Sequence, residues 1–203
     1  MFRTSRTSQP GDRIGLGRSF VFLCLLISFS ACAAHAATRV VDQAGGGDHT
    51  SIGAAVAAAS DGDTILIGAG RYIESIDTPK ALVFSGKDPD AVFWERHPDG
   101  WYSLEFDNAA YGEVHGIRFT DVGPGLAFSD VAGPSLVTNC RFEGLSFPDV
   151  AGAAIYSRDQ VIEILDCHFV DCHTTGAGWG PGAVYLYSLV EGGRVAGCTF
   201  ENC

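Results

Sequence analysis

Four short segments in the second half of the chain share one pattern of apolar and polar positions. Apolar residues occupy alternate positions, and each segment ends in phenylalanine, at intervals of 23, 27 and 31 residues. The segments are Val114–Phe119, Val137–Phe142, Ile164–Phe169 and Val195–Phe200. A period of two predicts a strand that buries one face. Short strands that recur at such intervals predict a solenoid, in which turns absorb the differences in length.

Residues 42–76 predict a cap for one end of this solenoid. Candidate N-cap residues at positions 48–51 precede an apolar stripe of Ile52, Ala55, Val56 and Ala59, which is typical of a helix. A turn at residues 61–63 leads into a short apolar strand at residues 64–67. A solenoid end exposes strand edges and core, so a helix that covers it is expected there. Residues 77–203 then form the coils.

The run GGGDHTSIGAAVAAASDGDTILIGAGRYIES, at residues 45–75, resembles the N-terminal segment of pectate-lyase-like right-handed β-helix proteins. Residues 80–93 resemble the next coil of that superfamily, and the four repeats resemble its later coils. The likeness covers roughly residues 42–203. It implies an all-β fold, a right-handed parallel β-helix solenoid with a short N-terminal capping helix, of the kind found in secreted bacterial repeat proteins.

The cysteines fall in two columns of the predicted stack. In-register parallel strands place equivalent side chains about 4.8 Å apart. The first column contains Ile117, Cys140, Cys167 and Cys198, and the second contains Val122, Leu145, Cys172 and Cys203. Because cysteine here replaces aliphatic residues, and because parallel side-chain vectors suit S–S geometry badly, we expect buried free thiols. An odd count of five in an exported chain also fits a disulfide framework with one thiol left over.

The first 36 residues predict a secretory signal. Four arginines precede the apolar run Phe20–Phe29, and an A-x-A sequence ends at Ala36. About 10 apolar residues are too few to span a bilayer, so no membrane span is expected. The mature domain is then 37–203, secreted, periplasmic or on the cell surface. In the alternative, Phe29–Cys32 resembles a lipobox that would place a lipid anchor on Cys32.

The mature chain is acidic. Removing four arginines and one aspartate from 13 basic and 24 acidic residues leaves 9 and 23, a net charge of −14. Such a surface repels nucleic acid and anionic membranes, so no nucleic-acid partner is expected. It also suits recruitment of Ca²⁺ as the one candidate ion, and no other cofactor is indicated.

A basic stripe is the candidate substrate-binding feature. Arg118, Arg141 and His168 lie between two inward columns, so they should project outward on successive coils. Arginine grips carboxylates in a fork, which suits a carboxylated sugar. In the lyases that the fold resembles, a groove holds an acidic polysaccharide, a Lys or Arg abstracts the proton α to the uronate carboxylate, and aspartates hold Ca²⁺. The resemblance therefore implies lyase-like binding or cleavage of an acidic polysaccharide, and solvated surface charge is the alternative.

The remaining Cys, His and Asp residues do not predict a metal or catalytic site. Cys167 and His168 point to opposite faces, and the same alternation applies to Cys172 and His173, so no metal site is expected. Aspartate pairs at positions 61/63 and 88/90 lie in expected turns, without Lys or Arg at matching positions of adjacent coils. Asp166 and Asp171 flank a strand, where turn-side hydrogen bonding is the simpler interpretation. No catalytic residue is identified.

The sequence stops within a repeat, at Cys203, so we expect further coils beyond this point. Two functions remain from different classes. The first is recognition or cleavage of an acidic polysaccharide, as a lyase or a glycosidase-like enzyme. The second is a non-catalytic, adhesin-like solenoid on the cell surface, or a fragment of one. Fold alone does not choose between them.

Overall fold

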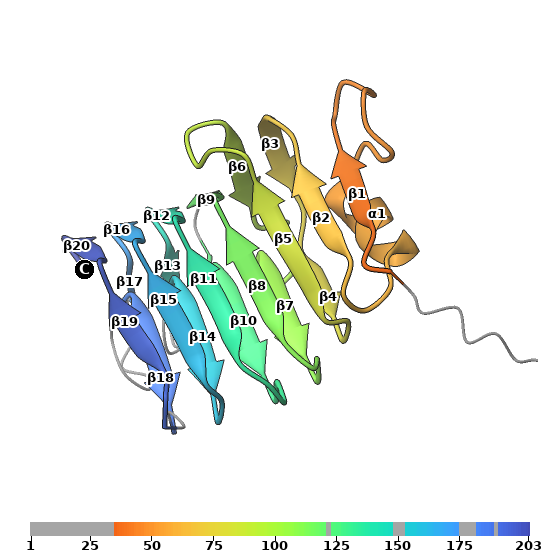
Figure 1. The fold of residues 1–203 in the computed structure, drawn as a ribbon. Helices are drawn as coiled ribbons and strands as arrows, with labels where there is room; N and C mark the ends of the chain where they lie inside the picture. The colour runs from red at the N-terminus through yellow and green to blue at the C-terminus, as the bar shows by residue number, and fades with distance from the viewer. Residues whose placement is uncertain (1–34, 121–122, 148–152, 175–181, 189–190) are drawn as a thin grey trace, which may run out of the picture. The chain divides into compact units, whose positions relative to one another are not determined.

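Hydrogen bonds between successive coils build three parallel sheets, in which each strand pairs with its equivalents one coil away (Figure 1). The computed structural model describes residues 35–120, 123–147, 153–174, 182–188 and 191–203. These residues form a β-solenoid of about five turns with one short helix. The predicted class of fold, an all-β parallel β-helix with a short helix near its N-terminal end, is confirmed.

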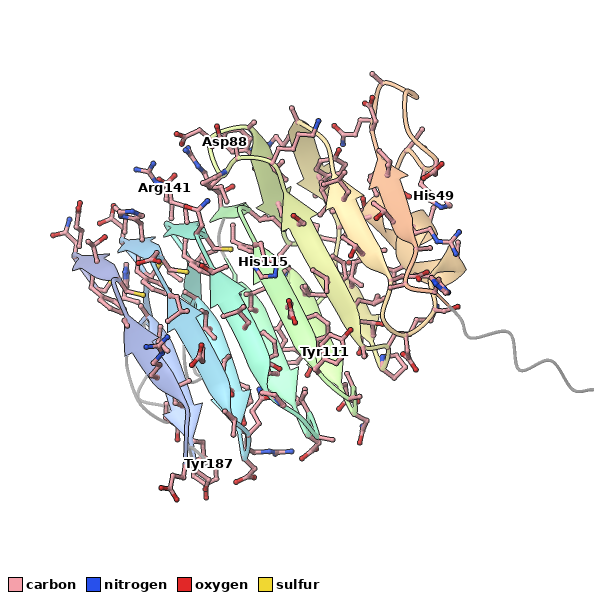
Figure 2. All side chains as sticks on the ribbon, viewed as in Figure 1. His49, Asp88, Tyr111, His115, Arg141 and Tyr187 are labelled. Carbon is pink, nitrogen blue, oxygen red and sulfur yellow. The ribbon has the colours of Figure 1, made fainter. Side chains whose placement is uncertain are left out.

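The largest sheet has seven strands, which follow one another along the solenoid in chain order. They are β1 (Thr38–Val41), β2 (Thr64–Ile67), β5 (Leu82–Gly86), β8 (Gly112–His115), β11 (Ser135–Thr138), β15 (Ile162–Leu165) and β19 (Arg194–Ala196). Sequence analysis missed β1, although its β-branched residues are typical of a strand. Figure 2 shows Tyr111 and His115 on the outer face of this sheet.

Two further sheets close the coils. The six-stranded sheet contains β3 (Gly70–Ile73), β6 (Val92–Glu95), β9 (Arg118–Thr120), β12 (Arg141–Glu143), β16 (His168–Val170) and β20 (Thr199–Glu201). The five-stranded sheet contains β4 (Ile76–Thr78), β7 (Leu104–Asp107), β10 (Leu126–Ser129), β14 (Ile155–Arg158) and β18 (Val184–Tyr187). A small fourth sheet pairs β13 (Ser146–Phe147) with β17 (His173–Thr174).

Each of the four repeats crosses a corner, and the expectation of one strand per repeat was wrong. The first half of a repeat belongs to the seven-stranded sheet and the second half to the six-stranded sheet. The first of the two residues between the strands has left-handed backbone, with φ between 52° and 68°: Gly116, Asn139, Asp166 and Gly197. Glycine, Asn and Asp tolerate this conformation best, and it redirects the chain into the next sheet.

Stacked phenylalanines form the interior of the six-stranded sheet. The ring centroids of Phe119 and Phe142 lie 5.2 Å apart, and those of Phe142 and Phe169 lie 4.9 Å apart. All three side chains are fully buried. The register pairs them directly, as the sequence spacing predicts. Offset and parallel aromatic contacts of this kind add to the stabilisation that burial provides.

The helix α1 (Ile52–Ala58) covers the core at the N-terminal end, where it packs against β1, β2 and β4. The Ser51 side chain caps its first turn, as predicted. Two contacts were not foreseen. The Glu74 carboxylate accepts hydrogen bonds from the backbone N–H groups of Ile52 and Gly53, at 2.9 and 2.7 Å. At the other end, the Lys80 ammonium donates to carbonyls of the last turn. The next coil therefore fastens both helix ends, which also suits the helix dipole.

No helix in the described part of the chain is long and apolar enough to cross a membrane. The predicted signal and the alternative lipid site at Cys32 lie outside the described residues, apart from His35 and Ala36.

Replacing a central ring of the phenylalanine stack tests the packing. Phe142→Ala should lower the free energy of unfolding by about 3–5 kcal/mol, because it removes buried apolar surface and leaves a cavity. Urea unfolding followed by circular dichroism measures this loss. Phe93→Ala is the control, because Phe93 lies on the outer side of the same sheet, and it should cost less than half as much. Equal losses in the two variants would contradict the inward stack.

Candidate functional site

The basic stripe lies on three adjacent strands, as expected. The register aligns Arg118 of β9 with Arg141 of β12, and Arg141 with His168 of β16. All three side chains project outward, but to different extents. The Arg118 side chain is only 17% exposed, the Arg141 side chain is 39% exposed, and His168 is exposed.

Two carboxylates neutralise the arginines of the stripe. Asp90 forms ion pairs with Arg118 and, at 3.4 Å, with Arg141. Glu143 approaches the same two guanidinium groups, at 3.6 Å from Arg118 and 2.6 Å from Arg141. Arg118 also lies over the Phe93 ring, 4.9 Å from its centroid, which holds the side chain against the sheet. The cluster therefore carries two positive and two negative charges, and Arg118 has little freedom to bind a ligand.

The sequence did not predict that Asp90 pairs with these arginines, because Asp90 does not occupy a matching position of the stack: the register aligns Phe93 with Arg118. Asp90 lies in the loop between β5 and β6, 28 residues before Arg118 and 51 before Arg141. Figure 2 shows Asp88, in the same loop, at the same end of the strands as Arg141. Asp90 in this loop contacts arginines of two later coils. The periodic pattern of the sequence does not predict contacts made by a loop.

The expectation of buried thiols holds for three of the five cysteines, because Cys198 is half-buried and Cys203 is exposed. The structure has five free cysteines among the described residues, and Cys140, Cys167 and Cys172 are buried. The neighbouring Cys140 side chain, and then burial, raise the pKa of the Cys167 thiol, and burial raises the pKa of Cys172 to about 12. Neutral thiols are poor nucleophiles and metal ligands. Across the described ranges, no group of three His, Cys, Asp or Glu side chains is arranged to hold a metal ion. Val122 of the second column lies outside those ranges.

Asp166 and Asp171 occupy corners of the coil. Both have left-handed backbone, with φ of 53° and 52°, and Asn202 has the same conformation one coil after Asp171. Their positions in turns are as expected, and the hydrogen bonding of their side chains stays a prediction.

A groove that sequence analysis did not identify lies at the N-terminal edge of the five-stranded sheet. One part of it, of about 240 Å³, lies between β4, β7 and the loop before β7. We call it the β4–β7 groove, and its lining residues are Ser75, Ile76, Asp77, Gly100, Trp101, Tyr102 and Glu105. Two further hollows share Ser75 and Ile76 with it and extend it toward α1 and toward His97.

Two carboxylates stand on neighbouring strands in this groove. The register aligns Asp77 of β4 with Glu105 of β7, so the two positions lie one coil apart, about 4.8 Å. Burial, and then the charge of Asp107, raise the pKa of Asp77. Burial also raises the pKa of Glu105, and the negative charges of Asp77 and Asp107 act in the same direction, while a 2.9 Å hydrogen bond from Ser129 opposes them. The charges that act on these carboxyl groups are thus other carboxylates, in contrast to the neutralised basic stripe.

Aromatic side chains accompany the carboxylates. Trp101 is 67% exposed although it is a large apolar residue. Burial raises the pKa of the neighbouring Tyr102 to about 12. Like any tyrosine, it presents a protonated hydroxyl at neutral pH, which can donate a hydrogen bond. Further along the outer face of the sheet, the rings of Tyr156 and Tyr185 stack with centroids 6.0 Å apart. Both tyrosines align with Glu105 through Ala127.

A weak signal for this groove was present in the sequence. Asp77 and Glu105 lie 28 residues apart, within the range of coil lengths, and a Pro98–Gly100 turn precedes Trp101. The repeats that define the coils begin only at Val114, so the first coils had no alignment that would place these residues in one column.

The fold and the site together define a parallel β-helix repeat protein with a lined groove on one outer sheet. No protein-family model matches the chain, and no curated protein matches it. Membership of the pectate-lyase-like superfamily therefore stays a prediction from resemblance.

Neutralising Glu105 tests the electrostatics of the groove. Between the unfolded pKa of about 4.3 and the raised folded pKa, the folded state holds more protons, so Glu105 makes stability fall as pH rises through this window. Glu105→Gln should therefore raise the free energy of unfolding at pH 7 and flatten its pH dependence above pH 4. Urea unfolding at a series of pH values measures both. Glu191→Gln, at an exposed position, should change neither. A Glu105→Gln variant less stable than the parent at pH 7 would contradict the raised pKa.

Proposed function

We propose that the protein is exported, to the periplasm, the medium or the cell surface, and binds a polysaccharide in the β4–β7 groove. The observation that carries the proposal is an exposed Trp101 beside a groove that also presents a protonated Tyr102 hydroxyl and two carboxylates. Binding sites of this type combine apolar surface with a few polar groups that converge on the ligand.

Sugars match both kinds of surface. The C–H face of a pyranose ring is apolar and packs on an aromatic ring, while its hydroxyl groups donate to carboxylates. Asp77 and Glu105 would accept such hydrogen bonds, and an ionised acceptor makes them stronger. The part of the groove that contains Trp101, Asp77 and Glu105 has no Lys or Arg among its lining residues, and its carboxylates already repel one another. Lys80 lines the hollow toward α1, but its ammonium donates to carbonyls of that helix. The proposed ligand is therefore an uncharged stretch of glycan.

The basic stripe supports a second candidate, binding or lyase-like cleavage of an acidic polysaccharide. The observation in its favour is that Arg118, Arg141 and His168 occupy one outward column. A lyase needs a free base and a cation that stabilises the enolate, with Ca²⁺ as the ion that the resemblance implies. Asp90 and Glu143 occupy both guanidinium groups, so the geometry favours the groove.

Trp101→Ala tests the groove. Loss of the exposed indole face should weaken binding to a neutral polysaccharide at least about tenfold, a loss of about 1.4 kcal/mol. Affinity electrophoresis against a panel of neutral and uronate-containing polysaccharides measures it. Tyr111→Ala, on the outer face of the seven-stranded sheet, is the control and should bind like the parent. A parent protein that binds no member of the panel supports the adhesin-like spacer instead.

The stripe is tested by Arg118→Ala and Arg141→Ala, separately and together. We expect each variant to keep the polysaccharide binding of the parent and to release no unsaturated uronate, with or without Ca²⁺. Absorbance of the unsaturated product and the same electrophoresis give the readouts. Loss of uronate binding in these variants, with Trp101→Ala unaffected, would move the function to the stripe.

A further inference from the structure

Asp63, in the turn before β2, is a buried carboxylate at the N-terminal edge of the solenoid. It is 2% exposed, and it accepts a 2.7 Å hydrogen bond from the backbone nitrogen of Ala37. The other carboxylate oxygen accepts from the Ser60 N–H at 3.0 Å and faces the Arg39 guanidinium at 3.3 Å. These hydrogen bonds hold the pKa of Asp63 below its ordinary value, with the bond from Ser60 first among them and the one from Ala37 second.

The Ala37 nitrogen lies at the predicted cleavage site of the secretory signal. It follows Ala36, the last residue of the predicted secretory signal. His35 and Ala36 are exposed and lie outside any helix or strand, whereas Ala37 is half-buried and its carbonyl accepts from Thr64 N–H at 2.8 Å. The peptide bond at the end of the predicted signal thus joins an exposed segment to the first paired residue of the solenoid.

We propose that hydrolysis of the Ala36–Ala37 bond places a new α-ammonium group on the Asp63 carboxylate and so anchors β1 by a buried ion pair. The step consumes one water molecule under catalysis by a protease of the signal-peptidase class. It breaks the C–N bond, leaves a carboxylate on Ala36 and leaves an ammonium on Ala37. The proposal rests on the export part of the proposed function.

The geometry favours this bond over its neighbours. An ammonium has three donors and a full charge, so its hydrogen bond to a carboxylate is stronger than that of the amide it replaces. A cut one residue earlier would move the charge about 3.8 Å along the chain and leave a neutral amide at Asp63. Lipid processing at Cys32 would also leave a neutral amide at Asp63, because five residues would precede Ala37.

The proposed ion pair lies at the start of β1, the first strand of the seven-stranded sheet. β1 is the edge strand of the seven-stranded sheet, and it pairs with β2 on one side and forms a single bridge, between Val41 and His49, on the other. Pairing of Ala37, the residue before β1, with the carboxylate beside β2 opposes fraying of that edge. The charged or titratable groups on the surrounding elements are His35, Arg39, Asp61, Asp63 and Lys80, the last of which is bonded to carbonyls of α1.

The first experiment identifies the mature N-terminus. The full chain is expressed in a bacterium with an active export pathway, and the exported protein is sequenced from its N-terminus and weighed intact. Ala37 as the first residue is the expected result. A chain that begins at a lipidated Cys32, or keeps its leader, overturns both the proposed processing and the anchor.

The second experiment measures the α-amine of that exported protein. Its rate of labelling by an amine-reactive anhydride is followed against pH in the folded and the urea-unfolded state. The ion pair should raise the amine pKa by at least about one unit above its unfolded value near 7.7, which slows labelling about fourfold at pH 8 and nearly tenfold at about pH 6.5. The matching stability is complete below about pH 7.7 and is lost as pH rises through the folded pKa.

Asp63→Asn and Asp99→Asn are the matched variants, because Asp99 is an almost fully exposed carboxylate. Asp63→Asn should return the labelling rate to the unfolded value, and Asp99→Asn should leave it slow. If Asp63→Asn does not fold, the labelling rates of the folded and unfolded parent still show whether the ion pair forms. A mature chain that begins at Ala37 but labels equally fast in both states overturns the ion pair and leaves export intact.

Discussion

In-register parallel stacking is the constraint on which the rest of this structure depends. Each residue lies about 4.8 Å from its equivalent one coil away, so like side chains tend to meet like. For apolar residues this is favourable, and the stacks of Phe119, Phe142 and Phe169 and of Cys140 and Cys167 form the interior. For charged residues it costs energy unless an opposite charge enters the column, because neighbouring like charges repel across a surface that is only partly solvated.

The molecule treats its two charged columns differently. In the column of Arg118 and Arg141, the carboxylates of Asp90 and Glu143 cancel the repulsion and fasten a loop across several coils. In the column of Asp77 and Glu105 the neighbouring charge is another carboxylate, and both pKa values are raised. The repulsion between the Asp77 and Glu105 carboxylates lies beside the exposed Trp101 and is not neutralised. Such an arrangement is more typical of a binding site than of a structural element, because binding sites often lower stability for the sake of function.

The features that could be predicted from the sequence are those that repeat from coil to coil. Four aligned repeats predicted the class of fold, the inward phenylalanines and cysteines, and the outward direction of Arg118, Arg141 and His168. The corner inside each repeat does break the period of two, because Val137 and Cys140 lie three residues apart around the left-handed Asn139, and the prediction of a single strand overlooked that break. The partners of the stripe and the residues of the groove were missed because Asp90 and Trp101 lie in loops, whose paths over the coils depend on tertiary contacts.

The most direct test of the account is a titration of the isotope-labelled exported protein with a neutral oligosaccharide, followed by two-dimensional ¹H–¹⁵N NMR. The account predicts that the indole N–H of Trp101 and the amides of Asp77, Tyr102 and Glu105 shift together, with the amides of β9 and β12 unchanged. Shifts confined to the amides of Arg118, Arg141 and His168, produced by a uronate oligomer and not by the neutral one, would contradict it.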